Sequence, residues 1–97
     1  MLEEFKKTLT QSEAPQELSP ALKALWEVAN DHWKQSHDIV NDINTPTGYW
    51  IHAHLHRVEG DLSNAAYWYH KADRPICDSS LEEEWCNLAA FLLDGNE

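Results

Sequence analysis

Residues 50–72, WIHAHLHRVEGDLSNAAYWYHKA, decide the fold of this chain. Two helical patterns meet there at Gly60 and Asp61, since glycine readily adopts the left-handed conformation that ends a helix and aspartate can cap the next. We expect one helix over about 47–59 and another over about 62–73. The segment therefore predicts two helices folded back on each other.

The rest of the chain is also helical in pattern. Cap residues that can start a helix stand at Ser19, Thr45, Asp61 and Ser80. Apolar residues recur at helical spacing in further segments at about 20–29, 32–43 and 80–93. Residues 2–10 predict a short amphipathic turn or two that must dock on the body to persist, and 11–18 read as a linker. We expect one all-α domain over 1–97, in which an N-terminal part (1–18) precedes a body (19–97), with about five helices in consecutive antiparallel hairpins.

The charge balance excludes several classes of partner. Seventeen acidic and seven basic residues give a formal net charge of −10, which disfavours binding to nucleic acid or to anionic membrane surfaces. No apolar run approaches the roughly 20 residues that span a bilayer, and the acidic, amphipathic N-terminus does not resemble a signal peptide. Cys77 and Cys86 would lie about 13 Å apart on one helix, too far for a disulfide. Free thiols suit a reducing compartment, so we expect a cytoplasmic protein.

The segment around Gly60 resembles a known repeat family. Residues 60–72, GDLSNAAYWYHKA, followed by Pro75, resemble the second helix of a tetratricopeptide repeat. The resemblance assigns turn, small-contact, aromatic and terminator roles to Gly60, Ala65, Tyr69, Ala72 and Pro75, and first-helix roles to Tyr49 and Ala53. It implies stacked hairpins that present a concave binding face. Pro75 comes about two residues early, and His52 and His56 replace apolar or aromatic residues of the family.

Two further similarities concern the same region. A shift of 29 residues superposes Pro46 on Pro75 and Ala24 on Ala53, as an internal repeat would. The string W-x-H-A-x-x-H-R-x-E-G-D-x-x-N-A-x-Y-W-Y over residues 50–69 also resembles a group of small helical proteins. That resemblance implies no activity.

Two histidines and a glutamate form the candidate metal site. His52 and His56 stand four residues apart on one helix face, and Glu59 follows three residues later. Two imidazoles and a carboxylate so placed could hold a divalent ion such as zinc, with water in an open position. The alternation H-A-H-L-H would also suit a metal-binding strand, but the flanking caps favour helix. The HExxH motif of metalloproteases is absent.

Two alternatives to the metal site remain open. The histidines could be a buried polar cluster that hydrogen-bonds near the second helix of the hairpin. They could instead line a pocket for a small molecule or an anion, with binding candidates His52, His56, Arg57, Glu59, Asn64 and Tyr69. Arg57 could orient a carboxylate or phosphate, or pair with Asp61 across the helix end.

Other side chains are expected at the surface or in the core. The aromatic residues near the hairpin are expected mostly in the core, with Trp50 or Tyr67 at a surface as partner-binding candidates. His54 should point away from His52 and be exposed. Solvated positions are also expected for His32, His37 and the acidic run Glu82–Glu84, and a core position for Cys86.

Binding is favoured over turnover. No catalytic residue can be assigned, and stacked hairpins suit recognition. The leading hypothesis is a small interaction or assembly module with a protein partner or a second copy of itself, and with no cofactor. The alternative is a small-molecule or metal-binding protein, including a hydrolase-type enzyme, with its pocket at His52, His56 and Glu59.

Overall fold

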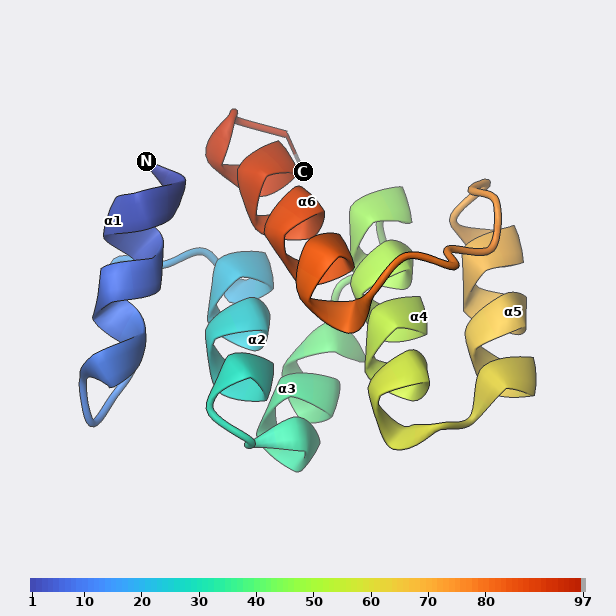
Figure 1. Cartoon of the computed structure of the whole chain (residues 1–97), viewed down its shortest axis with the longest axis horizontal. Coiled ribbons are helices and arrows are strands. Elements are labelled where there is room, and N and C mark those ends of the chain that lie inside the picture. The colour runs from blue at the N-terminus through green and yellow to red at the C-terminus, as the bar shows by residue number, and fades with distance from the viewer. Residues whose placement is uncertain (97) are drawn as a thin grey trace.

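The computed structural model describes residues 1–96 and is all-helical within them, as predicted from the sequence (Figure 1). The elements are α1 (Leu2–Lys7), a 3-10 turn (Thr8–Thr10), α2 (Pro20–Ala29), α3 (Trp33–Val40), α4 (Pro46–Glu59), α5 (Leu62–Lys71) and α6 (Leu81–Leu93). The helix count exceeds the expected five because α1 forms a complete helix. Residue 97, part of the predicted domain, lies outside the described residues.

Local capping fixes where four of the helices begin. In each, the cap oxygen accepts a hydrogen bond from the backbone N–H three residues later, at Ser19 (3.3 Å), Thr45 (3.0 Å), Asp61 (3.3 Å) and Ser80 (3.0 Å). Gly60 ends α4 with φ at +86°, a conformation that glycine adopts without strain. The sequence therefore predicts these boundaries correctly, whereas α3 ends three residues earlier than its apolar pattern suggested.

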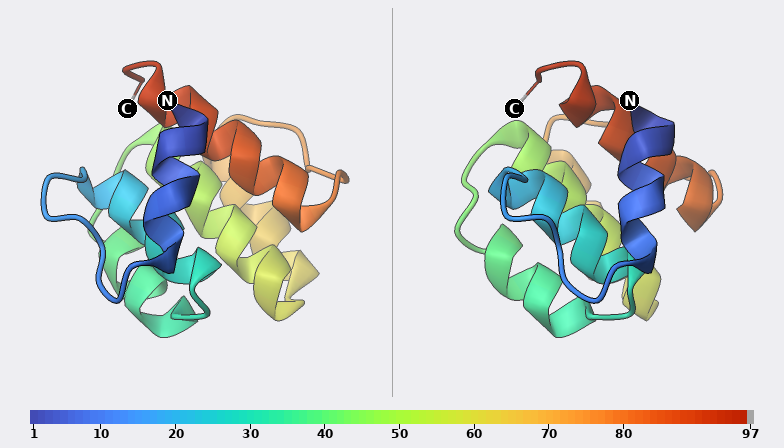
Figure 2. Two further views of the ribbon diagram at one scale, coloured as in Figure 1. Left: turned by 60° about the vertical axis from the view of Figure 1, so that its left-hand side comes forward. Right: turned by 90° about the vertical axis from the view of Figure 1, so that its left-hand side faces the viewer.

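Helix α4 occupies the centre of the molecule. It packs against α5, with which it forms the predicted hairpin, and against α3, α2 and α6. Helices α2 and α3 form a second hairpin. Helix α6 does not extend this row beyond α5: it crosses back and packs on α4, α2 and α1 (Figures 1 and 2). The chain thereby folds into a body with a radius of gyration of 12.3 Å.

The core uses tryptophan both for apolar area and for hydrogen bonds between elements. The Nε1–H of Trp85 on α6 donates to the carbonyl of Leu25 on α2 (2.9 Å), and that of Trp33 on α3 donates to Leu55 on α4 (2.7 Å). Both acceptors belong to helices, so each bond fixes the position of the tryptophan's helix relative to the helix that carries the acceptor. Fully buried aliphatic side chains fill the space between them: Leu25, Ile51, Leu55 and Leu88.

The N-terminal helix α1 packs against the body of the protein, as expected for so short a helix. Phe5 is buried and stacks on Trp85, with ring centroids 5.7 Å apart and an interplanar angle of 8°. Trp26 Nε1 donates to the carbonyl of Thr8 (3.1 Å). A helix of six residues is unstable alone, so these contacts hold α1 in place. Among residues 1–96, none of the helices has the length and apolarity needed to cross a bilayer.

Phe5→Ala is expected to lower the free energy of unfolding by about 3 kcal/mol, because it removes the aromatic contact with Trp85 and leaves a cavity. Urea denaturation followed by tryptophan fluorescence measures the change. Glu4→Ala is the matched control, since the Glu4 side chain is solvent-exposed. Equal stabilities of the two variants would contradict this account of α1.

Candidate metal centre

Helix α4 carries three histidines on two different faces. His52 and His56 face α3 and α5, where they meet Trp33, His37 and Trp68. His54 faces α6, where it meets Glu84. All three are buried, with exposed fractions of 2–6%. The prediction that His54 is exposed was therefore wrong: it points away from His52, but α6 covers that side of α4 as well.

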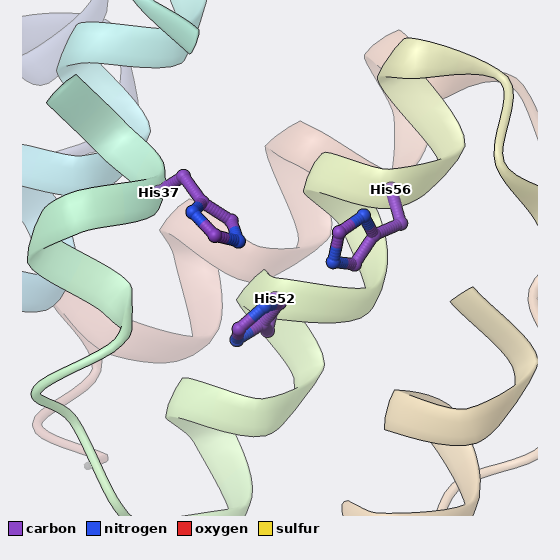
Figure 3. Close-up of side chains that lie close together, drawn as sticks. All are labelled: His37, His52 and His56. Carbon is purple, nitrogen blue, oxygen red and sulfur yellow. The ribbon is translucent and has the colours of Figure 1, made fainter. Parts of the chain in front are cut away.

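His37 of α3 completes a cluster of three imidazoles (Figure 3). One ring nitrogen from each of His37, His52 and His56 lies within 4.8 Å of the other two. The ring centroids are 4.8 Å apart for His37 and His52, and 5.0 Å apart for His52 and His56. His37 is partly buried rather than solvated as expected from sequence. Its position shows that the predicted pair is one side of a three-residue cluster.

Two tryptophans hold the rings in place. Trp33 stacks on His37 with centroids 4.7 Å apart, and Trp68 stacks on His52 at 3.7 Å, both nearly parallel. Trp33 also contacts His56 edge to face. These aromatic surfaces restrict ring rotation and lower the local dielectric constant around the imidazole nitrogens.

Hydrogen bonding orients one imidazole of the cluster and leaves another without a bond. Glu59 Oε2 lies 2.6 Å from His56 Nδ1. A carboxylate in this position fixes the tautomer, with Nδ1 protonated and the lone pair on Nε2. Within residues 1–96, the His52 ring makes no hydrogen bond with another residue. The sequence assigned Glu59 as a ligand, whereas its geometry makes it the group that orients His56.

Burial disfavours the charged form of two imidazoles of the cluster, His37 and His52. Burial, reinforced by the neighbouring His37 and His56, lowers the pKa of His52 to about 4. Burial followed by the proximity of His56 also lowers the pKa of His37. Neutral imidazoles have the free lone pairs that a metal ion requires, so these nitrogens are available as ligands at neutral pH.

The cluster can accommodate a tetrahedral ion after a small contraction. Zinc–nitrogen bonds of 2.0–2.1 Å place ligand nitrogens about 3.3 Å from one another, against the present limit of 4.8 Å. A second group, His56, Glu59 and Asp61, is equally close, but both its carboxylates are exposed and engaged elsewhere, Glu59 with His56 and Asp61 as the cap of α5.

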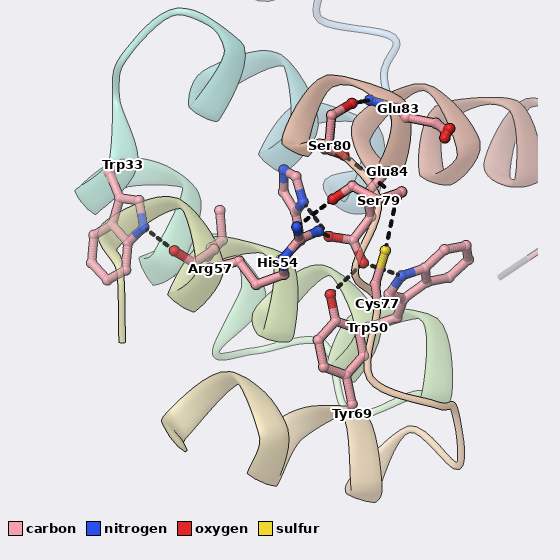
Figure 4. Close-up of polar contacts among 11 residues, drawn as sticks. Trp33, Trp50, His54, Arg57, Tyr69, Cys77, Ser79, Ser80, Glu83 and Glu84 are labelled. Atoms are coloured by element: carbon pink, nitrogen blue, oxygen red, sulfur yellow. Dashed lines mark hydrogen bonds and ion pairs between the residues drawn. The ribbon is translucent and has the colours of Figure 1, made fainter. Parts of the chain in front are cut away.

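The other predicted ligand residues belong to a separate network around Glu84 (Figure 4). Glu84 was expected to be solvated, yet it is 1% exposed. Its two oxygens accept hydrogen bonds from four donors: Trp50 Nε1 (3.1 Å), His54 Nδ1 (2.7 Å), an Arg57 NH group (2.8 Å) and the Tyr69 hydroxyl. Arg57 and Tyr69 therefore do not join the imidazole cluster. Arg57 pairs with Glu84 and the Ser79 carbonyl rather than with Asp61.

This network keeps a charge inside the protein. Burial would raise the pKa of Glu84, but the hydrogen bonds from His54, Tyr69 and Arg57 outweigh it and lower the pKa to about 2. The same contact raises the pKa of Arg57 against the effect of burial, and burial together with Glu84 raises the pKa of Tyr69. Because both oxygens of Glu84 are satisfied, we read this network as structural.

The remaining predicted residues divide between surface and core. Tyr67 is 58% exposed and Trp50 is buried, so one of the two aromatic partner candidates lies at the surface. Asn64 is partly buried, and its backbone N–H is held by the Asp61 cap. Cys86 is half-buried on α6 and, like Cys77, is a free thiol.

The sequence contains signals for the residues that were misplaced. Glu84 precedes Leu88 by four residues and Leu92 by eight, which places it on the same helix face as these buried leucines. Trp33 and His37 stand four residues apart, a spacing that predicts their stacking. No sequence pattern indicates which face of α4 would contact Trp33 and His37 of α3.

Comparison of the chain with models of known protein families, with curated proteins and with solved structures gives no match. The resemblances to a tetratricopeptide repeat and to the group of small helical proteins therefore remain expectations.

The free energy of unfolding should fall as the pH is lowered from about 6.5 to about 4. In that interval the unfolded chain protonates His52 while the folded chain, with its lowered pKa, does not. His52→Phe keeps a ring against Trp68 and should reduce this loss. Urea denaturation at pH 7, 6, 5 and 4 measures it, with exposed His70→Phe as the control. Parallel pH profiles for wild type and His52→Phe would refute the assignment.

Glu84→Gln should reduce the free energy of unfolding by about 3–5 kcal/mol, because the substitution leaves the Arg57 charge without its partner. Glu82→Gln, an exposed site on the same helix turn, should change it by less than about 0.5 kcal/mol. Denaturation at pH 7 compares the two. If Glu84→Gln lowers the free energy of unfolding by less than about 1 kcal/mol, the Glu84 network contributes little to stability.

Proposed function

We propose that this chain binds a divalent transition-metal ion, with zinc as the best fit, through His37, His52 and His56. The observation that carries the proposal is the convergence of three imidazole nitrogens within 4.8 Å of one another from two helices. Imidazole nitrogen suits zinc, whereas calcium and magnesium prefer oxygen ligands.

The surroundings of the cluster support a ligand rather than a purely structural role. Buried imidazoles in a structural cluster normally hydrogen-bond to protein groups, since an unmade bond costs roughly 1–3 kcal/mol. Here the His52 ring has no hydrogen bond to a protein group within the described residues, and the His56 ring is bonded at Nδ1 alone. None of the fully buried nitrogens there lacks a partner, so the free ring nitrogens keep contact with solvent. An ion between the rings would replace solvent at the ring nitrogens that lie within 4.8 Å of one another.

The Glu59–His56 contact is the arrangement found behind many metal ligands. A carboxylate that accepts a hydrogen bond from Nδ1–H raises the basicity of the imidazole and holds its Nε2 toward the ion. Three protein ligands leave a fourth position for water, as in catalytic rather than purely structural zinc sites. The chain therefore offers a site at which an ion could polarise a bound water.

A protein-interaction module is the second candidate function. Leu62 and Tyr67 expose apolar surface on α5, with exposed fractions of 68% and 58%. The α2/α3 and α4/α5 hairpins agree with the resemblance to a tetratricopeptide repeat, whereas α6 departs from it by crossing back over α4. A protein partner or a second copy of the chain would bind through this outer face of α5.

Zinc should bind to the purified, metal-free chain at a 1:1 ratio in isothermal titration calorimetry. It should also raise the melting temperature, with a stabilisation that grows with the logarithm of the free zinc concentration. His37→Gln should weaken binding at least tenfold because it removes the most accessible of the three ligands. Glu59→Gln should weaken it about 10- to 100-fold through loss of orientation of His56.

His70→Gln serves as the matched control, since it removes an exposed histidine that lies outside the cluster. Its affinity for zinc should equal that of wild type. An absence of 1:1 binding, or equal affinities for wild type and His37→Gln, would overturn the proposal and leave the interaction module as the better candidate.

A further inference from the structure

A separate groove lies on the side of α4 that faces away from the imidazole cluster. It has a volume of about 280 Å³ and is bordered by α1, the end of α2, α4 and the start of α6. Its wall is mainly apolar and is formed by Leu9, Val28, Val58, Leu81, Trp85 and Cys86. Val58 and Leu81 are exposed at 40% and 39%, so apolar surface continues from the groove to solvent.

One buried polar side chain reaches this apolar wall. His54 is 2% exposed and lines the groove. Within the described residues, its only hydrogen bond joins Nδ1 to Glu84. No fully buried side-chain nitrogen there lacks a hydrogen-bond partner, so Nε2 must keep a contact with the groove. Figure 4 shows this nitrogen on the side of the ring that points away from Glu84.

The Glu84 network determines whether Nε2 of His54 donates or accepts a hydrogen bond. Trp50 and Arg57 can only donate hydrogen bonds, and both donate to Glu84. The carboxylate is therefore the acceptor of the network, and His54 donates its Nδ1 proton. With the Nδ1 proton donated to Glu84, the lone pair of the neutral form of the ring lies on Nε2, where it can accept a hydrogen bond from a group in the groove.

The groove thus combines an apolar wall with one fixed acceptor. Its volume lies at the lower end of small-molecule sites, which corresponds to a single ring with small substituents. An occupant without a donor would expel water and leave the lone pair of Nε2 without a hydrogen-bond partner. The lost hydrogen bond would reduce the free energy of binding. An occupant with a hydroxyl or N–H donor on an apolar body would satisfy both the wall and the nitrogen.

We propose that this groove binds a small apolar molecule that carries one hydrogen-bond donor, of the phenol class, with its donor bonded to Nε2 of His54. The site is independent of the metal centre, because His54 lies outside the imidazole cluster. Lys6 and Glu82 at the rim leave the entrance without a dominant charge, which suits a neutral ligand.

Three ligands of similar size and shape test the proposal: p-cresol, which has a donor, 4-methylanisole, which has only an acceptor, and toluene, which has neither. Binding is measured with EDTA present, so that the metal centre plays no part. Chemical shifts of the backbone amides, the Trp85 indole and the His54 ring nitrogens follow the titration. We expect p-cresol to bind roughly tenfold more tightly than toluene, and 4-methylanisole no more tightly than toluene. The His54 Nε2 resonance should shift with p-cresol.

A groove-filling variant tests the location without disturbing the Glu84 network. Ala29 is exposed and lines the groove at the end of α2, so Ala29→Leu should weaken p-cresol binding at least fivefold. Ala66→Leu, the same change on α5, should leave it unchanged. Equal affinities for p-cresol and toluene, p-cresol binding that survives Ala29→Leu, or shifts confined to other surfaces would each overturn the proposal.

Discussion

A buried carboxylate constrains this fold more than any other group. Glu84 is almost completely enclosed, and its charge is tolerated only because four donors surround it. Those donors come from α4 and α5, while Glu84 itself belongs to α6. Arg57 additionally donates to the Ser79 carbonyl just before α6. The crossing of α6 over the hairpin therefore follows from an electrostatic requirement as well as from apolar burial.

The same requirement makes the two faces of α4 chemically different. Toward α6, the network takes one nitrogen of His54 and leaves the other at a groove. Toward α3 and α5, no buried charge competes for His52, and its neighbours are aromatic rings and other imidazoles. The central helix thus keeps imidazole nitrogens without a protein hydrogen bond at two sites, and Glu84 binds at only one of them.

The features predicted correctly from the sequence are those that depend on residues close together in the chain. Ser19, Asp61 and Ser80 cap helices through bonds that span three residues, so the boundaries can be read locally. The pair His52 and His56 was likewise visible from spacing. The contribution of His37 and the identity of the donors that meet Glu84 depend on contacts between segments 15 to 34 residues apart. Such pairings are set by how helices cross, and the periodicity of one helix does not encode them.

The composition and the site point to the same kind of ligand. An excess of ten negative charges raises the local concentration of cations around the protein, but exposed carboxylates alone favour calcium and magnesium as readily as zinc. Three imidazoles packed against Trp33 and Trp68 add the discrimination that the surface lacks, because nitrogen ligands favour the later transition metals. The acidic surface would attract divalent ions in general, and the buried cluster would select among them.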